Sequence, residues 1–325
     1  MTPIELPTEE RAHASATDAY QALLARLSRQ SVTKHFDAYA DVPWDDPAYA
    51  IDPTDRRWVA VVVDPTGAGL GGTSWFDSLT PAQQARLGLD LVASKMKVGL
   101  EFEAVLKRGL LEFAATLPNG SPEFRYVYHE VIEEAQHSLM FQEFVNRSGF
   151  DAVGLGPLER FATRFIVTLG RRFPALFFVF VLGGEDPIDY AQRQELRRGT
   201  QLHPLLERIM RIHVTEEARH LSFARHYLRQ QVPRLGKLRR IALGVGAPII
   251  LGIMSRMMLR PSPQIVRRHA IPAATLKQVY RHPDSRAELL ASLRKVRNLC
   301  TELGLITPAT RLIWKAVGLW DEPAA

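Results

Sequence analysis

Two segments of the chain carry a glutamate followed three residues later by a histidine, Glu134–His137 and Glu217–His220. Residues three apart lie on the same face of a helix, so both side chains of a pair can bind the same metal ion. A third pair, Glu10–His13, lies near the N-terminus and is expected to be accidental. With 20 Glu and 10 His among 325 residues, chance alone predicts fewer than one such pair. The repeated spacing therefore indicates a metal site built from two helices.

The chain contains a single cysteine, Cys300. One cysteine excludes an internal disulfide framework and any Cys-rich zinc or iron–sulfur site. It also favours a reducing, cytoplasmic setting. Metal binding must then depend on histidines and carboxylates, a donor set that suits iron or manganese.

The net charge of +6 is unevenly distributed. From Arg229 to the end there are 17 Lys and Arg but only 5 Asp and Glu, a net charge of +12, so the preceding residues carry −6. The basic character belongs to the last third of the chain. No nucleic-acid motif accompanies it, so we expect no nucleic-acid partner.

Hydrophobic periodicity predicts an all-α protein from Thr80 onward. The segment Thr80–Gln83 has the residues of a helix start, with Thr as N-cap, Pro at the first position and Gln at the third. Long helices are expected at 80–116, 122–148, 155–184 (continuing near 187–198) and 201–231. Further helices are expected at 14–38, 236–258, 261–281, 284–304 and 308–319. Four long helices with short connections predict a bundle. We therefore expect one domain spanning residues 1–325, with a metal-binding bundle at about 80–231 and a basic helical extension at about 232–325.

The longest uncharged apolar stretch, Ile241–Met254, has 14 residues. A membrane-spanning helix needs about 20. A buried helix is therefore favoured, and membrane contact is not expected. The alternative is peripheral contact with a membrane surface, because five basic residues flank the stretch. They are Lys237, Arg239, Arg240, Arg256 and Arg260.

Ferritin-like di-iron and di-manganese bundles combine two Glu-x-x-His pairs with one Glu from each of the other two helices. The first long helix offers Glu101 and Glu103. With about 100° per residue, Glu103 falls on the apolar face and Glu101 on the polar face. A carboxylate within an apolar stripe is costly unless it is paired or bound to metal, so we expect Glu103. The third helix supplies Glu185 after an apolar run, and a carboxylate at a helix end is the alternative role for it.

His213 lies one turn before Glu217 and shares its helix face. Glu130, one turn before Glu134, either orients a ligand or forms an ordinary pair. The expected ligand set is Glu103, Glu134, His137, Glu185, His213, Glu217 and His220. Four carboxylates neutralise two divalent cations, which makes such a buried cluster tolerable. We therefore expect two iron ions, with manganese as the alternative.

Four segments together resemble the p-aminobenzoate N-oxygenase family, strongly over about residues 75–230. They are Glu123–Glu130, Glu133–Gln142, Gly183–Glu185, and His213 with Glu217 and His220. The histidine that precedes the second Glu-x-x-His pair is the most specific point, because ordinary ferritin-like bundles lack it. The resemblance implies the same seven ligands and a ferritin-like four-helix core with added N- and C-terminal helices.

The resemblance also implies a non-haem di-iron oxygenase. In such an enzyme the reduced metals bind O2, form a peroxo species and transfer oxygen to a small substrate. The acceptor would be the nitrogen of an arylamine, giving hydroxylamine, nitroso or nitro products. An external electron donor of the ferredoxin or reductase type and a homodimer are expected. The alternatives are a ferroxidase or iron-binding protein without oxygenase activity, and a di-iron C-hydroxylase.

Arg297 is the candidate substrate-binding residue. On the predicted helix 284–304 it flanks an apolar stripe that includes Val296 and Cys300. A half-buried arginine there could bind the carboxylate of a substrate. The alternative is a surface arginine whose aliphatic stem covers the stripe.

Overall fold

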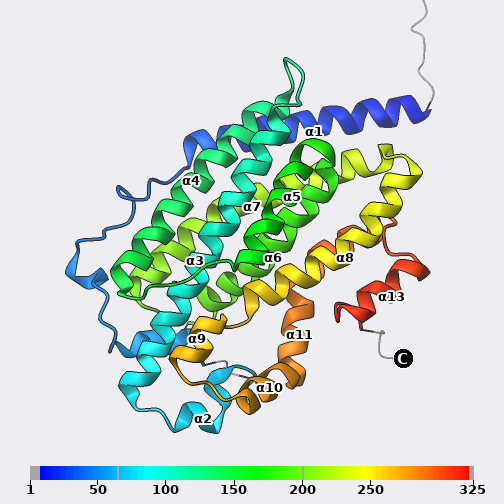
Figure 1. Ribbon diagram of the computed structural model, residues 1–325. Helices are drawn as coiled ribbons and strands as arrows, with labels where there is room; N and C mark the ends of the chain where they lie inside the picture. The colour runs from blue at the N-terminus through cyan, green and yellow to red at the C-terminus, as the bar shows by residue number, and fades with distance from the viewer. Residues whose placement is uncertain (1–7, 64–65, 200, 322–325) are drawn as a thin grey trace, which may run out of the picture.

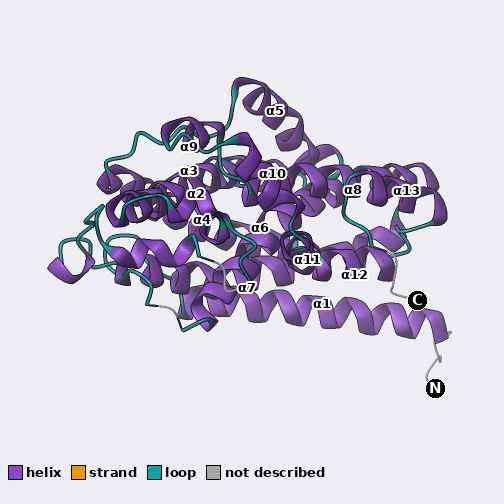
Figure 2. Cartoon of the chain, turned by 90° about the horizontal axis from the view of Figure 1, so that it is seen from below, coloured by secondary structure: helices purple, strands orange, loops and turns teal. Residues whose placement is uncertain are grey.

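The computed structural model describes residues 8–63, 66–199 and 201–321, with side chains from Thr17 onward. The side chains of the Glu10–His13 pair therefore lie outside the described residues. Within these ranges the chain forms thirteen α-helices and no strand (Figure 2). The predicted all-α, ferritin-like fold class is confirmed.

Four long helices carry the expected metal ligands, and Figure 1 shows them running along one another in the centre of the molecule. They are α3 (Pro81–Ala114), α4 (Pro122–Ser148), α6 (Pro174–Arg197) and α7 (Pro204–Gln231). Each begins with a proline in its first turn, where the missing N–H is not needed. Thr80 and Gln83 form the expected capping box, in which each side chain accepts a hydrogen bond from the other residue's backbone N–H.

Further helices surround this core. They are α1 (Thr8–Thr33), α2 (Ser74–Asp77), α5 (Pro157–Arg172), α8 (Lys237–Leu259), α9 (Pro263–Arg268), α10 (Ala273–Arg281), α11 (Pro283–Ser292), α12 (Arg294–Glu302) and α13 (Pro308–Ala316). Short 3-10 turns occur at η1 (Pro47–Tyr49), η2 (Arg56–Val61), η3 (Leu70–Gly72) and η4 (Val232–Arg234). Helix α1 packs against α4 and α7, whereas α8 packs along α6.

The third bundle helix differs from the prediction of a helix at 155–184. The chain breaks at Phe173 instead, so that α5 ends there and α6 begins at Pro174. Helix α6 then continues through Pro187, although an internal proline loses one backbone hydrogen bond. Close packing holds this part of α6, since Gly183 and Gly184 lie against Leu251 and Phe102. As a result Glu185 lies inside a helix and not at its end.

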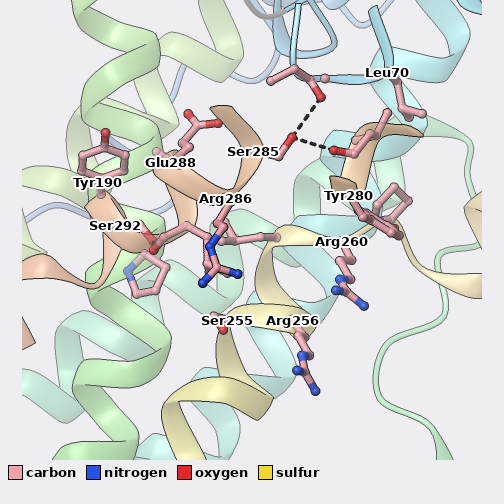
Figure 3. A pocket seen from close by; sticks show the side chains of 18 of the residues that line it. Leu70, Tyr190, Ser255, Arg256, Arg260, Tyr280, Ser285, Arg286, Glu288 and Ser292 are labelled. Atoms are coloured by element: carbon pink, nitrogen blue, oxygen red, sulfur yellow. Dashed lines mark hydrogen bonds between the residues drawn. The ribbon is translucent and has the colours of Figure 1, made fainter. Parts of the chain in front are cut away.

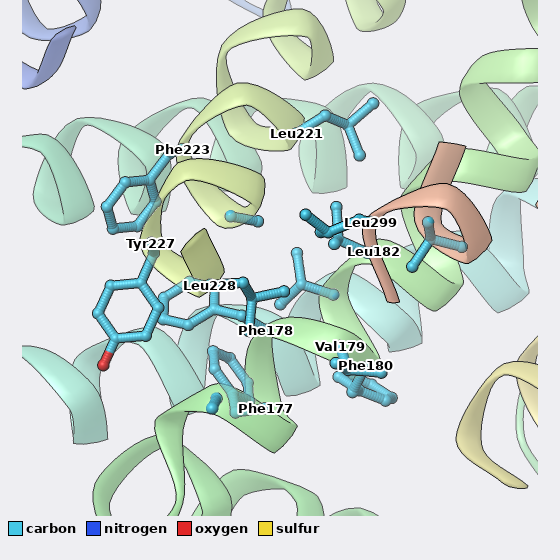
Figure 4. Packing of buried hydrophobic residues seen from close by; sticks show 14 of the residues in the cluster. Phe177, Phe178, Val179, Phe180, Leu182, Leu221, Phe223, Tyr227, Leu228 and Leu299 are labelled. Atoms are coloured by element: carbon cyan, nitrogen blue, oxygen red, sulfur yellow. The ribbon is translucent and has the colours of Figure 1, made fainter. Parts of the chain in front are cut away.

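Two apolar clusters lie on either side of the expected metal ligands. One is rich in aromatic rings from α6 and α7, among them Phe178, Phe223 and Tyr227 (Figure 4). The other surrounds Trp58 and includes Phe144. On each of α3, α4 and α7 the ligands lie between residues of the first cluster and residues of the second. The polar cluster is therefore sealed along the bundle axis by apolar packing.

Candidate metal centre

The seven expected ligands lie in one buried cluster in the middle of the bundle. None of their side chains is more than 3% exposed. Three groups have potential ligand atoms within 4.8 Å of one another. These groups are Glu103–His137–His213, Glu134–Glu217–His220 and Glu185–His213–Glu217. His213 and Glu217 each belong to two groups and so join all seven residues into one site.

Glu217 lies at the centre of the cluster. Its Oε1 is 3.2 Å from Nδ1 of His220, 3.5 Å from Nδ1 of His137 and 3.7 Å from Nε2 of His213. One carboxylate oxygen therefore approaches a ring nitrogen of every histidine in the set. A residue in this place can bridge two metal ions.

Five buried atoms of the cluster have no hydrogen-bond partner among the described residues. They are Oε1 of Glu103, Oε1 and Oε2 of Glu134, Oε2 of Glu217 and Nδ1 of His137. Buried polar atoms are almost always satisfied, because leaving one without a partner is costly. Carboxylate oxygens and an imidazole nitrogen are the donors that iron and manganese take. The residues present thus fit a pair of such cations.

The ionisation of these groups supports the same interpretation. Burial raises the pKa of Glu103 to about 8, and the neighbouring charge of Glu134 adds to the shift. Burial also raises the pKa of Glu185 well above its usual value, and repulsion from the Glu217 carboxylate raises it further. Burial opposes ionisation of Glu134 as well, but the adjacent imidazoles outweigh it and lower the pKa of this carboxyl. Without metal the cluster therefore retains protons, which divalent cations displace when they bind.

Two further carboxylates orient the histidines. Glu133 accepts a hydrogen bond from Nε2 of His220 at 2.8 Å, and Glu216 accepts one from Nε2 of His137 at 2.9 Å. Each histidine is thus held by a glutamate from the other helix, and its Nδ1 is left facing the cluster. Such partners fix the ring orientation and increase the basicity of the ligand.

Arg219 and Gln192 complete this outer layer. The Arg219 guanidinium, buried between α4 and α7, donates to Glu133 at 2.7 Å and to Glu216 at 3.3 Å. Gln192 Oε1 lies 2.9 Å from Nδ1 of His213, so that Nε2 of this histidine faces the cluster. These outer-layer roles of Glu133, Glu216, Arg219 and Gln192 were not predicted from the sequence. A signal for the two glutamates was present, since both pairs belong to a longer repeat, Glu-Glu-Ala-x-His.

Glu101 and Glu103 have different surroundings. Glu101 accepts a hydrogen bond from the backbone N–H of Leu155 at 2.9 Å and pairs with Arg160 at 3.2 Å. Glu103 points into the cluster, where Oε2 accepts a hydrogen bond from the Ser138 hydroxyl. The geometry therefore agrees with the helix-face argument that favours Glu103.

Replacing Glu103 by alanine should lower the iron content from two ions per chain to about one, because Glu103 belongs to only one of the three groups. Metal analysis after anaerobic loading with ferrous iron measures this. Glu101→Ala is the matched control and should keep both ions. The reverse pattern would mean that the ligand is Glu101.

Glu130 and Arg297 are the two remaining residues for which the sequence suggested a role at the site. Glu130 is fully buried, and burial raises its pKa to about 8. Neither of its carboxylate oxygens has a hydrogen-bond partner among the described residues, so a role in orienting a ligand stays a prediction. Arg297 lies on α12, where its guanidinium reaches the carbonyl of Leu319 at 3.5 Å. Arg297 belongs neither to the metal cluster nor to the lining of the cavity between α3, α6 and α8. A role in substrate binding stays a prediction for it.

A cavity of about 620 Å³ lies between α3, α6, the end of α8 and the helices α10 and α11 (Figure 3). Pro187, two residues after Glu185, forms part of its wall. Lys95 lies deep in the protein, yet its side chain is accessible because it projects into this cavity. Burial lowers the pKa of Lys95, although Glu195 and Glu288 oppose the shift. The lining of the cavity thus includes the basic side chain of Lys95.

Comparison with known proteins identifies the family of the chain. Residues 17–304 match the family described as P-aminobenzoate N-oxygenase AurF. The uncharacterized proteins Mb0909 of Mycobacterium bovis and Rv0885 of Mycobacterium tuberculosis are each 38% identical to the chain over 311 residues. The aligned region covers 95% of this chain and 90% of each relative. No solved structure matches the chain significantly. The chain therefore belongs to the p-aminobenzoate N-oxygenase AurF family.

Proposed function

We propose that the protein is a non-haem di-iron oxygenase that uses O2 to oxidise the nitrogen of a small arylamine. The observation that carries the proposal is the cluster of four buried carboxylates and three imidazoles with unpartnered ligand atoms. Family membership supports an oxygenase over a ferroxidase or a C-hydroxylase. His213 supports it as well, because a simple iron-storage bundle does not need a third imidazole.

The proposed ligands are Glu103, Glu134, His137, Glu185, His213, Glu217 and His220. Two bound iron ions would supply the redox chemistry that O2 activation requires. Three imidazoles cannot be divided equally between two metals, so the two ions would differ in their ligands. Manganese is the alternative metal for the same donors.

The surrounding residues hold this ligand set in place. Glu133, Glu216 and Gln192 fix the histidine rings through the nitrogens that face away from the cluster. The apolar clusters on either side keep bulk water out, which strengthens every electrostatic interaction inside.

We infer that the cavity whose wall includes Pro187 of α6 receives the substrate. Its wall combines apolar surface with Tyr190, Lys95 and several arginines, Arg256 and Arg260 among them. A flat aromatic amine with an acidic substituent fits this lining, because Lys95 can donate a hydrogen bond to a carboxylate. Substrate oxidation would also need an external electron donor, and we propose a cytoplasmic homodimer.

The proposal is tested with protein loaded with ferrous iron, a reductant, O2 and a panel of arylamines. The expected products are hydroxylamine, nitroso and nitro compounds, separated by chromatography and identified by mass. Accumulation of a ferric mineral without any oxidised amine would support a ferroxidase. Products hydroxylated on the ring would support a C-hydroxylase.

Replacing Lys95 by methionine should raise the KM for a carboxylated arylamine. A hydrogen bond to a charged group contributes about 1.5–3 kcal/mol, so the increase should be on the order of ten- to a hundredfold. The KM for the same amine without its carboxylate should change little. Lys97→Met is the control, because Lys97 contacts Gln142 at 3.1 Å and does not line the cavity. An equal change for both substrates would argue against Lys95 as the carboxylate-binding residue.

A further inference from the structure

Helix α8 has two apolar faces, and only one of them is covered. Leu243, Ala247, Leu251 and Met254 are buried in the core on the side of α6. The opposite face exposes an unbroken apolar stripe over about four turns. Its members, with exposed fractions, are Leu238 (84%), Ile241 (54%), Val245 (37%), Ile249 (42%) and Ile253 (59%). The apolar stretch expected to form a buried helix is thus only half buried.

Helix α5 adds a second exposed apolar patch. Leu158 is 80% exposed, Phe161 is 54% exposed and Phe165 is 63% exposed. Helices α5 and α8 both pack on α6, and in Figure 2 both lie on the side of the bundle away from α1. We call the exposed residues of these two helices the α5–α8 face. Exposed apolar surface of this extent on a folded chain usually marks an interaction site.

The charges on this face are almost all positive. Helix α5 contains Arg160, Arg164, Arg171 and Arg172, and helix α8 contains Lys237, Arg239, Arg240 and Arg256. Arg160 forms an ion pair with Glu101 of α3, which leaves seven cations. The two helices contain a single acid, Glu159, which caps the start of α5. The complement of this face is therefore a surface that is apolar inside and negatively charged at its edge.

We propose that the α5–α8 face docks on the surface of an anionic lipid bilayer. The isoleucines of α8 and the phenylalanines of α5 enter the boundary between headgroups and acyl chains, while the arginines contact lipid phosphates. Helix α8 lies on the bilayer and does not cross it. The stretch Lys237–Arg268 is long and apolar enough to span, but half of its most apolar window is buried inside the protein.

A second copy of the chain fits this face less well. Antiparallel packing of α8 on itself would bring Lys237 and Arg239 of each copy against Arg256 and Arg260 of the other. Parallel packing would bring each cation against its own counterpart. Like charges placed across an interface oppose association, whereas anionic lipid neutralises all of them.

The face is continuous with the cavity. Arg256 and Arg260 follow the apolar stripe at the end of α8, and both also line the cavity, as Figure 3 shows. Docking would therefore bring this rim of the cavity to the lipid surface, where an apolar substrate could enter from the bilayer. That consequence rests on the proposed function, whereas docking itself does not.

The test is co-sedimentation of the full chain with vesicles. One set contains phosphatidylcholine alone, and the other contains phosphatidylcholine mixed with anionic phosphatidylglycerol. We expect binding to the anionic vesicles that weakens as salt is added, and little binding to the neutral ones. The triple variant Ile241→Ser, Ile249→Ser, Ile253→Ser should bind at least about tenfold more weakly, since each side chain contributes buried apolar area. The charge variant Lys237→Glu, Arg164→Glu should lose the preference for anionic lipid.

The matched control is Ile132→Ser, Leu139→Ser on α4, at positions that are 57% and 45% exposed outside the α5–α8 face. It should bind vesicles like the unaltered protein, and iron content should be unchanged in every variant. Equal binding to both kinds of vesicle, or equal loss in the control, would overturn the proposal. A dimer that the triple variant converts to a monomer, with no vesicle binding in either, would make the face an interface between copies. Vesicle binding needs no turnover, so its failure and failure of the oxygenase assay are separate results.

Discussion

Glu217→Ala should remove both iron ions, whereas the loss of a ligand that serves one ion should remove only that ion. Glu217 belongs to two of the three ligand groups, and its Oε1 approaches His137, His213 and His220 within 3.7 Å. Changes in residues that merely orient a ligand already weaken metal binding about 10–100-fold. Loss of the shared ligand should therefore exceed about 100-fold and abolish oxidation of any substrate.

Iron per chain after anaerobic reconstitution and desalting measures this effect. Glu207→Ala is the control on the same helix, because Glu207 pairs with the exposed Arg211 and belongs to none of the ligand groups. The control should retain two ions. If Glu217→Ala retains one tightly bound ion, Glu217 does not serve both iron ions, and its proposed role as the shared ligand is wrong.

Arg219→Met should cause the largest loss of stability among changes outside the ligand set. Arg219 is the buried cation between Glu133 and Glu216, and it is only 5% exposed. Removing one member of a buried charge network leaves the others uncompensated, which costs about 3–5 kcal/mol in the free energy of unfolding. Arg211→Met removes an exposed pair and should cost at most about 1 kcal/mol. Denaturant unfolding of the metal-free proteins compares the two.

The difference in the free energy of unfolding between the unaltered protein and Arg219→Met should depend on pH. Burial opposes ionisation of Glu133, but hydrogen bonds from His220 and Arg219 outweigh it and lower the pKa of this carboxyl from 4.5 to about 2. Its contribution to stability is complete above pH 4.5 and is lost as the pH falls toward 2. The difference between the unaltered protein and Arg219→Met should therefore narrow below pH 4.5. A difference that stays constant or widens would mean that Arg219 does not act through Glu133.

The ligand cluster could be anticipated because its signals are local. The spacing in Glu134–His137 and in Glu217–His220 defines a helix face by itself. The burial cost of a carboxylate identifies Glu103 without knowledge of its neighbours. The hydrogen bonds that Glu133 and Glu216 accept could not be anticipated, because each glutamate binds a histidine on the other helix and its role depends on how the two helices pack.

The remaining differences have a similar origin. Pro174 and Pro187 look equivalent in the sequence, and only the surrounding packing decides that one begins a helix and the other lies inside it. The argument for Arg297 assumed one helix over 284–304. The chain instead breaks at Leu293 between α11 and α12, yet the apolar residues of the stripe, Leu293, Val296 and Cys300 among them, stay together in the core, and Arg297 is half-buried beside them. The cavity is lined by segments that are distant in sequence, so no local sequence pattern predicts it.

The exchange of glutamates between α4 and α7 has a consequence for how the protein matures. Glu133 and His220 are 87 residues apart in sequence, and His137 and Glu216 are 79 apart. Neither histidine has its orienting partner until both helices have been synthesised and have docked. A nascent chain that has released only α4 from the ribosome therefore offers metals a flexible Glu-x-x-His pair and no defined geometry. Iron capture should follow tertiary folding, and the unfinished chain should discriminate poorly between iron and competing cellular cations.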